Sequence, residues 1–383
     1  MFTNALSTPS FSQQTHFITG STGFIGSSVV LELLMHTKDD IYCLVRSTKN
    51  KSAQQRFMDL ITDLIVQYNY QNLISISDLQ RCKIVEGDLF SSFDRIKNQV
   101  FAKVNYFWHV AASLNYDEKY KEDIYHINIA GCKNILELAY QLNTQKFNHF
   151  STAYVVGKKT GEILETVVEN SESNNIYEQS KLAAEKIILA ENRFEIKIFR
   201  PSIVIGHSKT YFAFNFSGLY GFIRRLVQYK NIITKTDKQY LENNPIKLIM
   251  DKDVLVNVVP VDYVAKAAVK VGLSNTTQKV FHLTSKSVPK AITVVDAIFK
   301  MVGAGKPMYS NSAVGFNELD LQFNEKIDFY SSYLEGTKHF SKSNSDNILN
   351  NDSSLVDCLN VDEILQYVTW YLNELGVKDL ETN

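Results

Sequence analysis

Short apolar runs alternate with longer amphipathic stretches over the first two hundred residues of the chain. Strict alternation of strands and helices predicts a parallel sheet with helices on both faces. The apolar runs lack polar alternation, which indicates strands that are buried on both sides. The predicted strands are His16–Thr19, Ile41–Val45, Lys83–Glu86, Tyr106–His109, Phe147–Ser151 and Lys197–Phe199. The predicted helices are Phe24–Met35, Ala53–Gln67, Ile124–Leu142 and Tyr177–Asn192.

The pattern changes after Gly206. Residues 207–250 are rich in aromatic and basic side chains, and Asn243-Asn244-Pro245 breaks any helix there. Residues 305–357 show little periodicity and contain the polar stretch Ser341–Ser354, which predicts a loop or a partly disordered segment. The other elements predicted are strands at Val254–Pro260 and Val280–Leu283, and helices at Val261–Leu273, Ile292–Val302 and Val361–Leu375.

The predicted fold class is α/β: a doubly wound parallel-sheet Rossmann domain with a smaller, mostly helical C-terminal cap. We expect residues 1–15 to form an N-terminal extension. The nucleotide-binding core is predicted for residues 16–206 and about 251–284. The substrate-binding cap is predicted for about 207–250 and 285–383.

Composition and charge exclude several classes of partner. The 383 residues carry 40 basic and 41 acidic side chains, so no global charge indicates nucleic acid or an anionic membrane. Cys43, Cys82, Cys132 and Cys358 form no CxxC or Cys/His cluster, which argues against a metal site and fits a reducing compartment. No apolar run reaches about 18 residues, and the first fifteen residues do not resemble a signal peptide. We therefore expect no transmembrane segment and a cytoplasmic location.

A glycine-rich stretch, Thr19–Gly26, follows the first predicted strand and opens the first predicted helix. In such a turn Gly20 permits the tight bend, Gly23 lets the backbone approach a pyrophosphate, and Gly26 lets helix and strand pack closely. The helix N-terminus then presents free N–H groups and a favourable dipole to the phosphates. Tight turns also need glycine for steric reasons alone, but the position between strand and helix favours nucleotide binding. The predicted contacts are Gly20, Thr22, Gly23, Phe24, Ile25 and Gly26.

Arg46 ends the second strand, where an NAD site usually has an acidic residue for the ribose 2′-hydroxyl. Arginine can instead hold a 2′-phosphate with two parallel hydrogen bonds. The alternative is a solvated basic loop, since Lys49 and Lys51 follow. The position of Arg46 favours NADP (NADPH) as the cofactor.

Further cofactor contacts are predicted where the later strands end. Asp88 could meet the adenine amino group, although a turn-forming Gly-Asp pair explains it equally well. Asn128 could face inward and support Lys181 through water, or it could be an exposed helix residue. The small residues after the fourth strand leave room for the cofactor backbone, and the segment after the sixth strand could wall the nicotinamide. These positions are Leu89, Ala111, Ala112, Ser113, Pro201, Ser202 and Val204.

The candidate catalytic residues are Thr152, Tyr177 and Lys181. The Tyr–Lys spacing of four residues places both side chains on one helical face. A nearby ammonium stabilises a phenolate, so Lys181 could lower the pKa of Tyr177 toward the working range and also hold the nicotinamide ribose. Thr152 ends the fifth strand, where its hydroxyl could hydrogen-bond a substrate carbonyl oxygen.

Together these motifs resemble the extended short-chain dehydrogenase/reductases, and most closely their thioester reductase and fatty acyl-CoA reductase branch. The similarity covers about residues 15–300. The motifs that carry it are Thr19–Gly26, Tyr42–Arg46, Gly87–Leu89, His109–Ser113, Ser151–Val155, Tyr177–Lys181, Arg200–Ser202, Asn257–Val264 and Phe281–Thr284.

The resemblance implies NADPH-dependent reduction of an acyl thioester to an aldehyde, and leaves open a second round that gives an alcohol. It implies Arg56 as a second contact to the 2′-phosphate, and delivery of the thioester in trans by CoA or an acyl carrier protein. Family members often have glycine where this chain has Tyr211, which leaves the shape of the substrate entrance open. The aromatic residues of 211–229 could cover an acyl chain or form the core of the cap.

Two alternative functions remain open at this point. One is ketone reduction or sugar-nucleotide epimerisation or dehydration on the same fold, because fold does not determine chemistry. The other is a non-catalytic dinucleotide-binding subunit. The intact Thr152, Tyr177 and Lys181 set argues against the second alternative.

Overall fold

The computed structural model describes residues 13–237, 239–328, 333, 336–349, 352, 355 and 357–377. Its largest sheet is parallel throughout and has seven strands in the order β11-β7-β5-β4-β1-β2-β3. The strands are β1 (Thr15–Thr19), β2 (Asp40–Val45), β3 (Cys82–Glu86), β4 (Tyr106–His109), β5 (Lys146–Phe150), β7 (Glu195–Pro201) and β11 (Val280–Leu283). The expected N-terminal extension, residues 1–15, lies outside the described residues up to residue 12.

Both faces of this sheet are covered by helices, as predicted. Side chains alternate between the faces of a strand, so neighbours in β1 belong to different clusters. Ile18 packs with α1 (Phe24–His36) and α10 (Val261–Leu273) on one face. Phe17 packs with α6 (Gly131–Gln141) and α7 (Ile176–Leu189) on the other. The doubly wound α/β architecture is therefore confirmed.

The helix predicted for Ile124–Leu142 is a composite of three parts. It consists of α5 (Lys121–Tyr125), a π-helical turn (His126–Ala130) and α6. Single π-helical turns recur at functional sites because the extra residue reorients the side chains around it. The remaining core helices are α2 (Ala53–Gln67), α3 (Ile76–Leu79) and α4 (Phe93–Lys97), and short 3-10 helices occur at Glu118–Tyr120 and Ala153–Val156.

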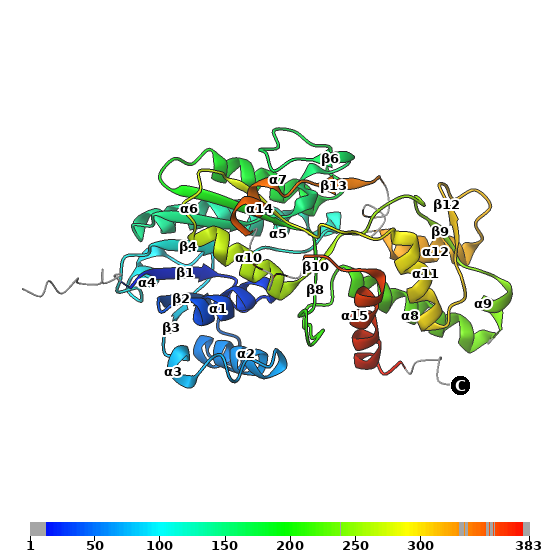
Figure 1. Cartoon of the computed structure of the whole chain (residues 1–383), viewed down its shortest axis with the longest axis horizontal. Coiled ribbons are helices and arrows are strands. Elements are labelled where there is room, and N and C mark those ends of the chain that lie inside the picture. The colour runs from blue at the N-terminus through cyan, green and yellow to red at the C-terminus, as the bar shows by residue number, and fades with distance from the viewer. Residues whose placement is uncertain are drawn as a thin grey trace, which may run out of the picture.

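A second group of helices gathers at the opposite end of the molecule from the sheet (Figure 1). Helix α15 packs against α8 and α11 of this group. The division into core and cap by residue range remains a prediction. The elements of this end are α8 (Leu219–Thr236), α9 (Tyr240–Asn243), β9 (Lys247–Ile249), α11 (Ala291–Val302), β12 (Met308–Ser310), α12 (Glu318–Lys326) and α15 (Val361–Glu374). The parallel pair β8 (Ile203–Ile205) and β10 (Val258–Pro260) lies between the two ends.

The expectation of a loop over residues 305–357 is wrong for most of the described part. Besides β12 and α12, it contains β13 (Lys338–Phe340) and α14 (Ser343–Leu349). Strand β13 pairs with β6 (Gly161–Ile163), and α14 packs on α10 and β11. Glu165 orders this segment, because its carboxylate accepts hydrogen bonds from the Ser345 hydroxyl at 2.5 Å and the His282 amide at 2.7 Å. Polar tertiary contacts of this kind leave no hydrophobic period in the sequence.

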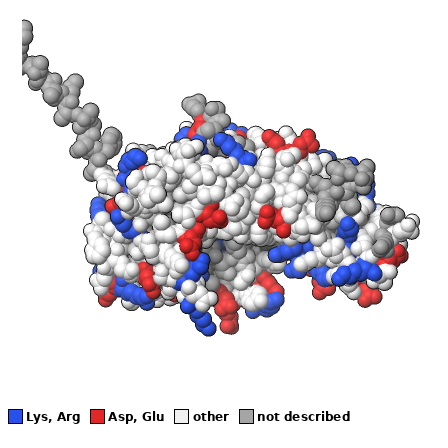
Figure 2. All heavy atoms as spheres, turned by 90° about the horizontal axis from the view of Figure 1, so that it is seen from below, with Lys and Arg blue, Asp and Glu red and all other residues white. Residues whose placement is uncertain are grey.

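Charged side chains of both signs are interspersed over the face in Figure 2, which accords with the formal net charge of -1. None of the described helices has both the length and the apolar character that crossing a membrane requires.

Candidate active site

The turn between β1 and α1 requires glycine at two positions for different reasons. Gly20 has a φ of 74°, and a Cβ there would lie 2.6 Å from the backbone nitrogen of Ala111. A Cβ on Gly26 would overlap the carbonyl of Gly20, so the helix could not pack on the turn. Helix α1 has no side-chain N-cap and no acidic residue in its first turn. Its first amide groups and its dipole can therefore bind an anion.

A single cavity of about 990 Å³ extends from this turn to the second group of helices. It contains all three candidate catalytic residues and all predicted cofactor contacts except Ser113 and Asn128. The predicted residues in its lining are Gly20, Thr22, Gly23, Phe24, Ile25, Gly26, Arg46, Arg56, Asp88, Leu89, Ala111, Ala112, Thr152, Tyr177, Lys181, Pro201, Ser202 and Val204.

The two arginines predicted to bind the 2′-phosphate lie side by side at this cavity. The side chain of Arg46 is exposed, and Arg56 Nη1 donates a hydrogen bond of 3.0 Å to the Arg46 carbonyl. Within the described part of the chain, neither guanidinium forms an ion pair with a carboxylate. Both groups can therefore turn toward a phosphate.

Asp88 is engaged in its own turn. Its Oδ1 accepts hydrogen bonds from the Phe90 amide at 2.8 Å and the Ser91 hydroxyl at 3.2 Å. This geometry favours the structural explanation of the Gly-Asp pair, although Asp88 and Leu89 both line the cavity.

Asn128 is buried, so the alternative of an exposed helix residue is wrong. It lies in the π-helical turn, and its Oδ1 accepts a hydrogen bond of 2.7 Å from the Ser113 amide. Its Nδ2 donates to the Ser113 carbonyl at 3.1 Å and to the Ser180 hydroxyl at 2.9 Å. Asn128 therefore joins the loop after β4 to helix α7, one residue before Lys181, and positions the site without lining the cavity.

The three candidate catalytic residues converge on the cavity from two elements. Thr152 follows β5, and its hydroxyl accepts a hydrogen bond of 3.3 Å from the Tyr154 amide. Tyr177 lies in the first turn of α7, where the Asn175 side chain caps the helix, and Lys181 follows one turn later. The orphaned hydroxyls of Ser151 and Ser202 are buried in the same lining, where a bound molecule could satisfy them.

The ionisation of this group differs from the expectation. Burial, and then the charge of Glu178, raises the pKa of Tyr177 above its ordinary value. Burial lowers the pKa of Lys181 to about 8. Lys181 Nζ donates a hydrogen bond of 2.5 Å to the Phe150 carbonyl. The predicted lowering of the Tyr177 pKa by Lys181 is absent from this structure, in which burial dominates.

Two further parts of the cavity lie outside the predicted site residues. The first contains Phe214 and Phe216, which the sequence offered either as cover for an acyl chain or as core of the cap. The segment before α8 contributes Phe214, Asn215, Phe216, Ser217 and Gly218. Helix α11 contributes Ala291, Val294, Val295 and Ile298. The helical spacing of the α11 residues indicates one apolar face, but such a face packs against protein as readily as it lines a cavity.

The family model described as "Male sterility protein" matches residues 18–268. The chain belongs to this NAD(P)-binding family. Its homologues include fatty acyl-CoA reductases and reductase domains of peptide synthetases, which confirms the predicted resemblance. The chain is thus an NAD(P)-binding domain of the extended short-chain dehydrogenase/reductase type.

Two curated relatives each match about half of this chain. The fatty acyl-CoA reductase wat of Drosophila melanogaster is 29% identical over an alignment of 225 residues, and the match covers 49% of this chain and 42% of the relative. The non-canonical nonribosomal peptide synthetase cpsA of Aspergillus campestris is 29% identical over an alignment of 211 residues, and the match covers 51% of this chain and 20% of the relative. The chain therefore spans less than half the length of either relative.

A solved structure, the terminal R domain from the myxalamid PKS-NRPS biosynthetic pathway, shares the fold over nearly its whole length. The TM-score is 0.71 at 22% identity, and the match covers 97% of this chain and 94% of that domain.

Proposed function

We propose that the chain is an NADPH-dependent reductase that converts an acyl thioester, presented by CoA or an acyl carrier protein, to an aldehyde or, in a second round, to an alcohol. The observation that carries this proposal is the continuity of one cavity. It joins the glycine-rich turn and two arginines to a hydroxyl, a phenol and an ammonium group. It then continues along an apolar wall that suits an acyl chain.

The residues at the first end of the cavity fit NADPH. The bend at Gly20 and the uncapped start of α1 suit a pyrophosphate. Arg46 and Arg56 suit a 2′-phosphate. When bound, the cofactor supplies the hydride that reduces the thioester carbon.

At the centre of the cavity, the side chains handle the oxygen and the proton. The Thr152 hydroxyl donates a hydrogen bond to the thioester carbonyl oxygen, where negative charge develops during reduction. Tyr177, whose pKa burial raises, donates the proton that this oxygen takes up, which gives a hemithioacetal. Collapse of the hemithioacetal breaks the C–S bond: the oxygen gives up its proton, the sulfur takes one up, and the aldehyde and the free thiol of CoA or the carrier are released. Lys181 lies one helical turn from Tyr177 and is positioned to hold ribose hydroxyls.

The test uses the purified chain, NADPH and a panel of acyl-CoAs, carrier-bound acyl groups, ketones and nucleotide sugars. We expect NADPH oxidation with the thioesters and an aldehyde or alcohol product by mass spectrometry. The variant Tyr177→Phe should bind NADPH and lose turnover. Turnover of only ketones or sugars would overturn the thioester proposal, and NADPH binding without turnover of any substrate would favour a non-catalytic subunit.

A further inference from the structure

The glycine-rich turn touches the far part of the cavity through one aromatic pair. Phe24 is the first residue of α1, and Phe214 lies in the segment between β8 and α8. Their rings meet edge-on at a centroid distance of 5.3 Å and an interplanar angle of 85°. Both residues line the cavity. The pair therefore stands where the predicted nucleotide end meets the apolar end.

The apolar end has few groups that could satisfy a polar substrate. Helix α11 lines it with Ala291, Val294, Val295 and Ile298, and α8 adds Phe222. Because an unpaired buried polar group is costly, such a wall selects aliphatic chains over hydroxylated or amide-rich ones. Arg224, which is exposed, stands in the same lining and could meet a phosphate of the carrier arm.

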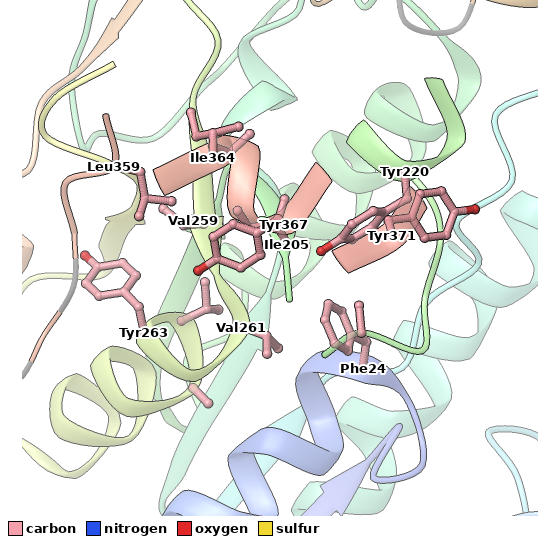
Figure 3. Packing of buried hydrophobic residues seen from close by; sticks show 14 of the residues in the cluster. Phe24, Ile205, Tyr220, Val259, Val261, Tyr263, Leu359, Ile364, Tyr367 and Tyr371 are labelled. Atoms are coloured by element: carbon pink, nitrogen blue, oxygen red, sulfur yellow. The ribbon is translucent and has the colours of Figure 1, made fainter. Parts of the chain in front are cut away.

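Helix α15 supports the segment that carries Phe214 from behind. Trp370 packs edge-on against Phe212 at 5.7 Å. Tyr371 packs against Phe216 at 5.0 Å and against Tyr220 at 4.9 Å. Figure 3 shows Tyr371 beside Tyr220, with Phe24 nearby at the start of α1. Neither Trp370 nor Tyr371 lines the cavity, so both act on it only through the segment in front of them.

The segment begins at a strained residue that α15 also contacts. Tyr211 has a φ of 60°, a left-handed conformation that L side chains rarely adopt. Its amide donates a hydrogen bond of 2.9 Å to the His207 carbonyl, and its ring packs edge-on against Tyr367 of α15 at 4.9 Å. Such strain persists only where the surroundings hold it. Tyr211 itself does not line the cavity.

We propose that Phe214 is a selectivity residue that walls the acyl chain off from the nucleotide end, and that Trp370 and Tyr371 are positioning residues that hold it there. This inference rests on the proposed thioester reduction. It places a determinant of acyl selectivity in α15, beyond residues 18–268 that the family model matches. Such a wall contacts the acyl chain equally in the bound substrate and in the transition state, so its loss raises KM and leaves kcat unchanged.

The test compares variants with acetyl-, octanoyl- and dodecanoyl-CoA and measures NADPH binding separately. Phe214→Leu should raise KM for dodecanoyl-CoA about tenfold, with kcat and the NADPH Kd within about twofold. Tyr371→Leu should raise the same KM about threefold, and Tyr371→Phe, which keeps the ring, should restore it. The double variant Phe214→Leu/Tyr371→Leu should be no worse than Phe214→Leu alone, because both act through one wall.

Ile364→Val is the matched control, since Ile364 is buried on α15 beside Leu359, away from Phe24 (Figure 3). If Tyr371→Leu does not fold, the half-buried Trp370 provides Trp370→Leu in its place. Additive effects in the double variant, or a control that matches Tyr371→Leu, would overturn the inference while thioester reduction stands. No thioester turnover by the natural chain would overturn both.

Discussion

Arg200 on β7 and Glu185 on α7 form a fully buried, two-point ion pair. Arg200 Nε donates to Oε1 at 2.9 Å and Nη2 donates to Oε2 at 2.6 Å, while Nη1 donates to the Thr166 carbonyl at 3.0 Å. The two side chains are 0% and 1% exposed. Glu185 lies one turn beyond Lys181, so the pair fixes the helix that carries Tyr177 and Lys181 to the sheet.

Glu185→Ala should lower the free energy of unfolding by about 3 to 5 kcal/mol, because it leaves a guanidinium buried and unpaired. The double variant Glu185→Leu/Arg200→Met should recover most of that loss, since neither charge remains. Urea unfolding of the three proteins measures both values. A loss below about 1 kcal/mol for the single variant would show that the pair does not anchor α7.

Gly20→Ala should lower the free energy of unfolding far more than Gly161→Ala does. Both glycines have positive φ, 74° and 80°, so both variants carry left-handed strain of about 1 kcal/mol. A Cβ at Gly161 meets no atom within 4 Å, whereas one at Gly20 meets the Ala111 backbone at 2.6 Å. The clash should cost about 1 to 3 kcal/mol more and weaken NADPH binding. Equal unfolding free energies for the two variants would contradict this.

Arg46→Ala should raise the Kd for NADPH about ten- to a hundredfold and leave the Kd for NADH within about twofold. The reason is loss of charge-assisted hydrogen bonds to the 2′-phosphate. Lys49→Ala is the control, because Lys49 is exposed in the same loop and does not line the cavity. Fluorescence titration with each cofactor gives the ratio of the Kd for NADPH to the Kd for NADH. An unchanged ratio in Arg46→Ala would remove the basis for NADP specificity.

Lys181 should make stability depend on pH in the alkaline range. Burial lowers its pKa from 10.5 to about 8, so between these values the unfolded chain holds a proton that the folded chain lacks. The free energy of unfolding therefore rises with pH over that window, and the contribution is flat below about pH 8. In Lys181→Met, the free energy of unfolding should lack this rise, which amounts to up to about 3 kcal/mol across the window. Lys197, whose pKa is also lowered to about 8, is present in both proteins, so their difference isolates Lys181.

Tyr211→Ala should be less stable than Tyr211→Gly by about 1 kcal/mol. Both variants lose the ring contact with Tyr367, but only alanine keeps a Cβ at a φ of 60°. Thermal and urea unfolding measure the difference. The reverse order would show that the backbone relaxes at this position once the ring is gone.

The elements whose signal is local were predicted well. Strand β4, helices α2 and α10, and strand β11 have the predicted bounds, because each is a compact apolar or amphipathic run between breakers. The glycine-rich turn was predicted equally well, since backbone geometry requires glycine at positions 20 and 26. Thr152 was expected at the cavity because strand ends meet at one edge of a parallel sheet, and Tyr177 and Lys181 were expected to share one helical face because they are four residues apart.

What the sequence did not disclose depends on contacts between distant segments. The sequence left open whether Asn128 faces inward, and its burial and its hydrogen bonds to Ser113 and Ser180 in the π-helical turn decide this. The predicted pKa shift of Tyr177 has the wrong direction, because residue spacing does not reveal burial, and burial is the largest cause of the shift here. Likewise, the sequence left open whether the aromatic residues of 211–229 cover an acyl chain or form the core of the cap, and only the contact with Phe24 distinguishes Phe214 from the others.

The apolar end of the cavity is built from α8 and α11, with α15 packed behind them. These three helices are not consecutive in the sequence. The chain returns to the sheet as α10 and β11 between α8 and α11, and as α14, which packs on α10 and β11, between α11 and α15. No single excision therefore removes this end intact. An attempt to transplant acyl preference from a relative by exchanging residues 207–250 alone would pair a foreign α8 with the resident α11 and α15, and mismatched aromatic packing would follow. Engineering the preference of this enzyme class calls for coordinated replacement at several junctions along the chain.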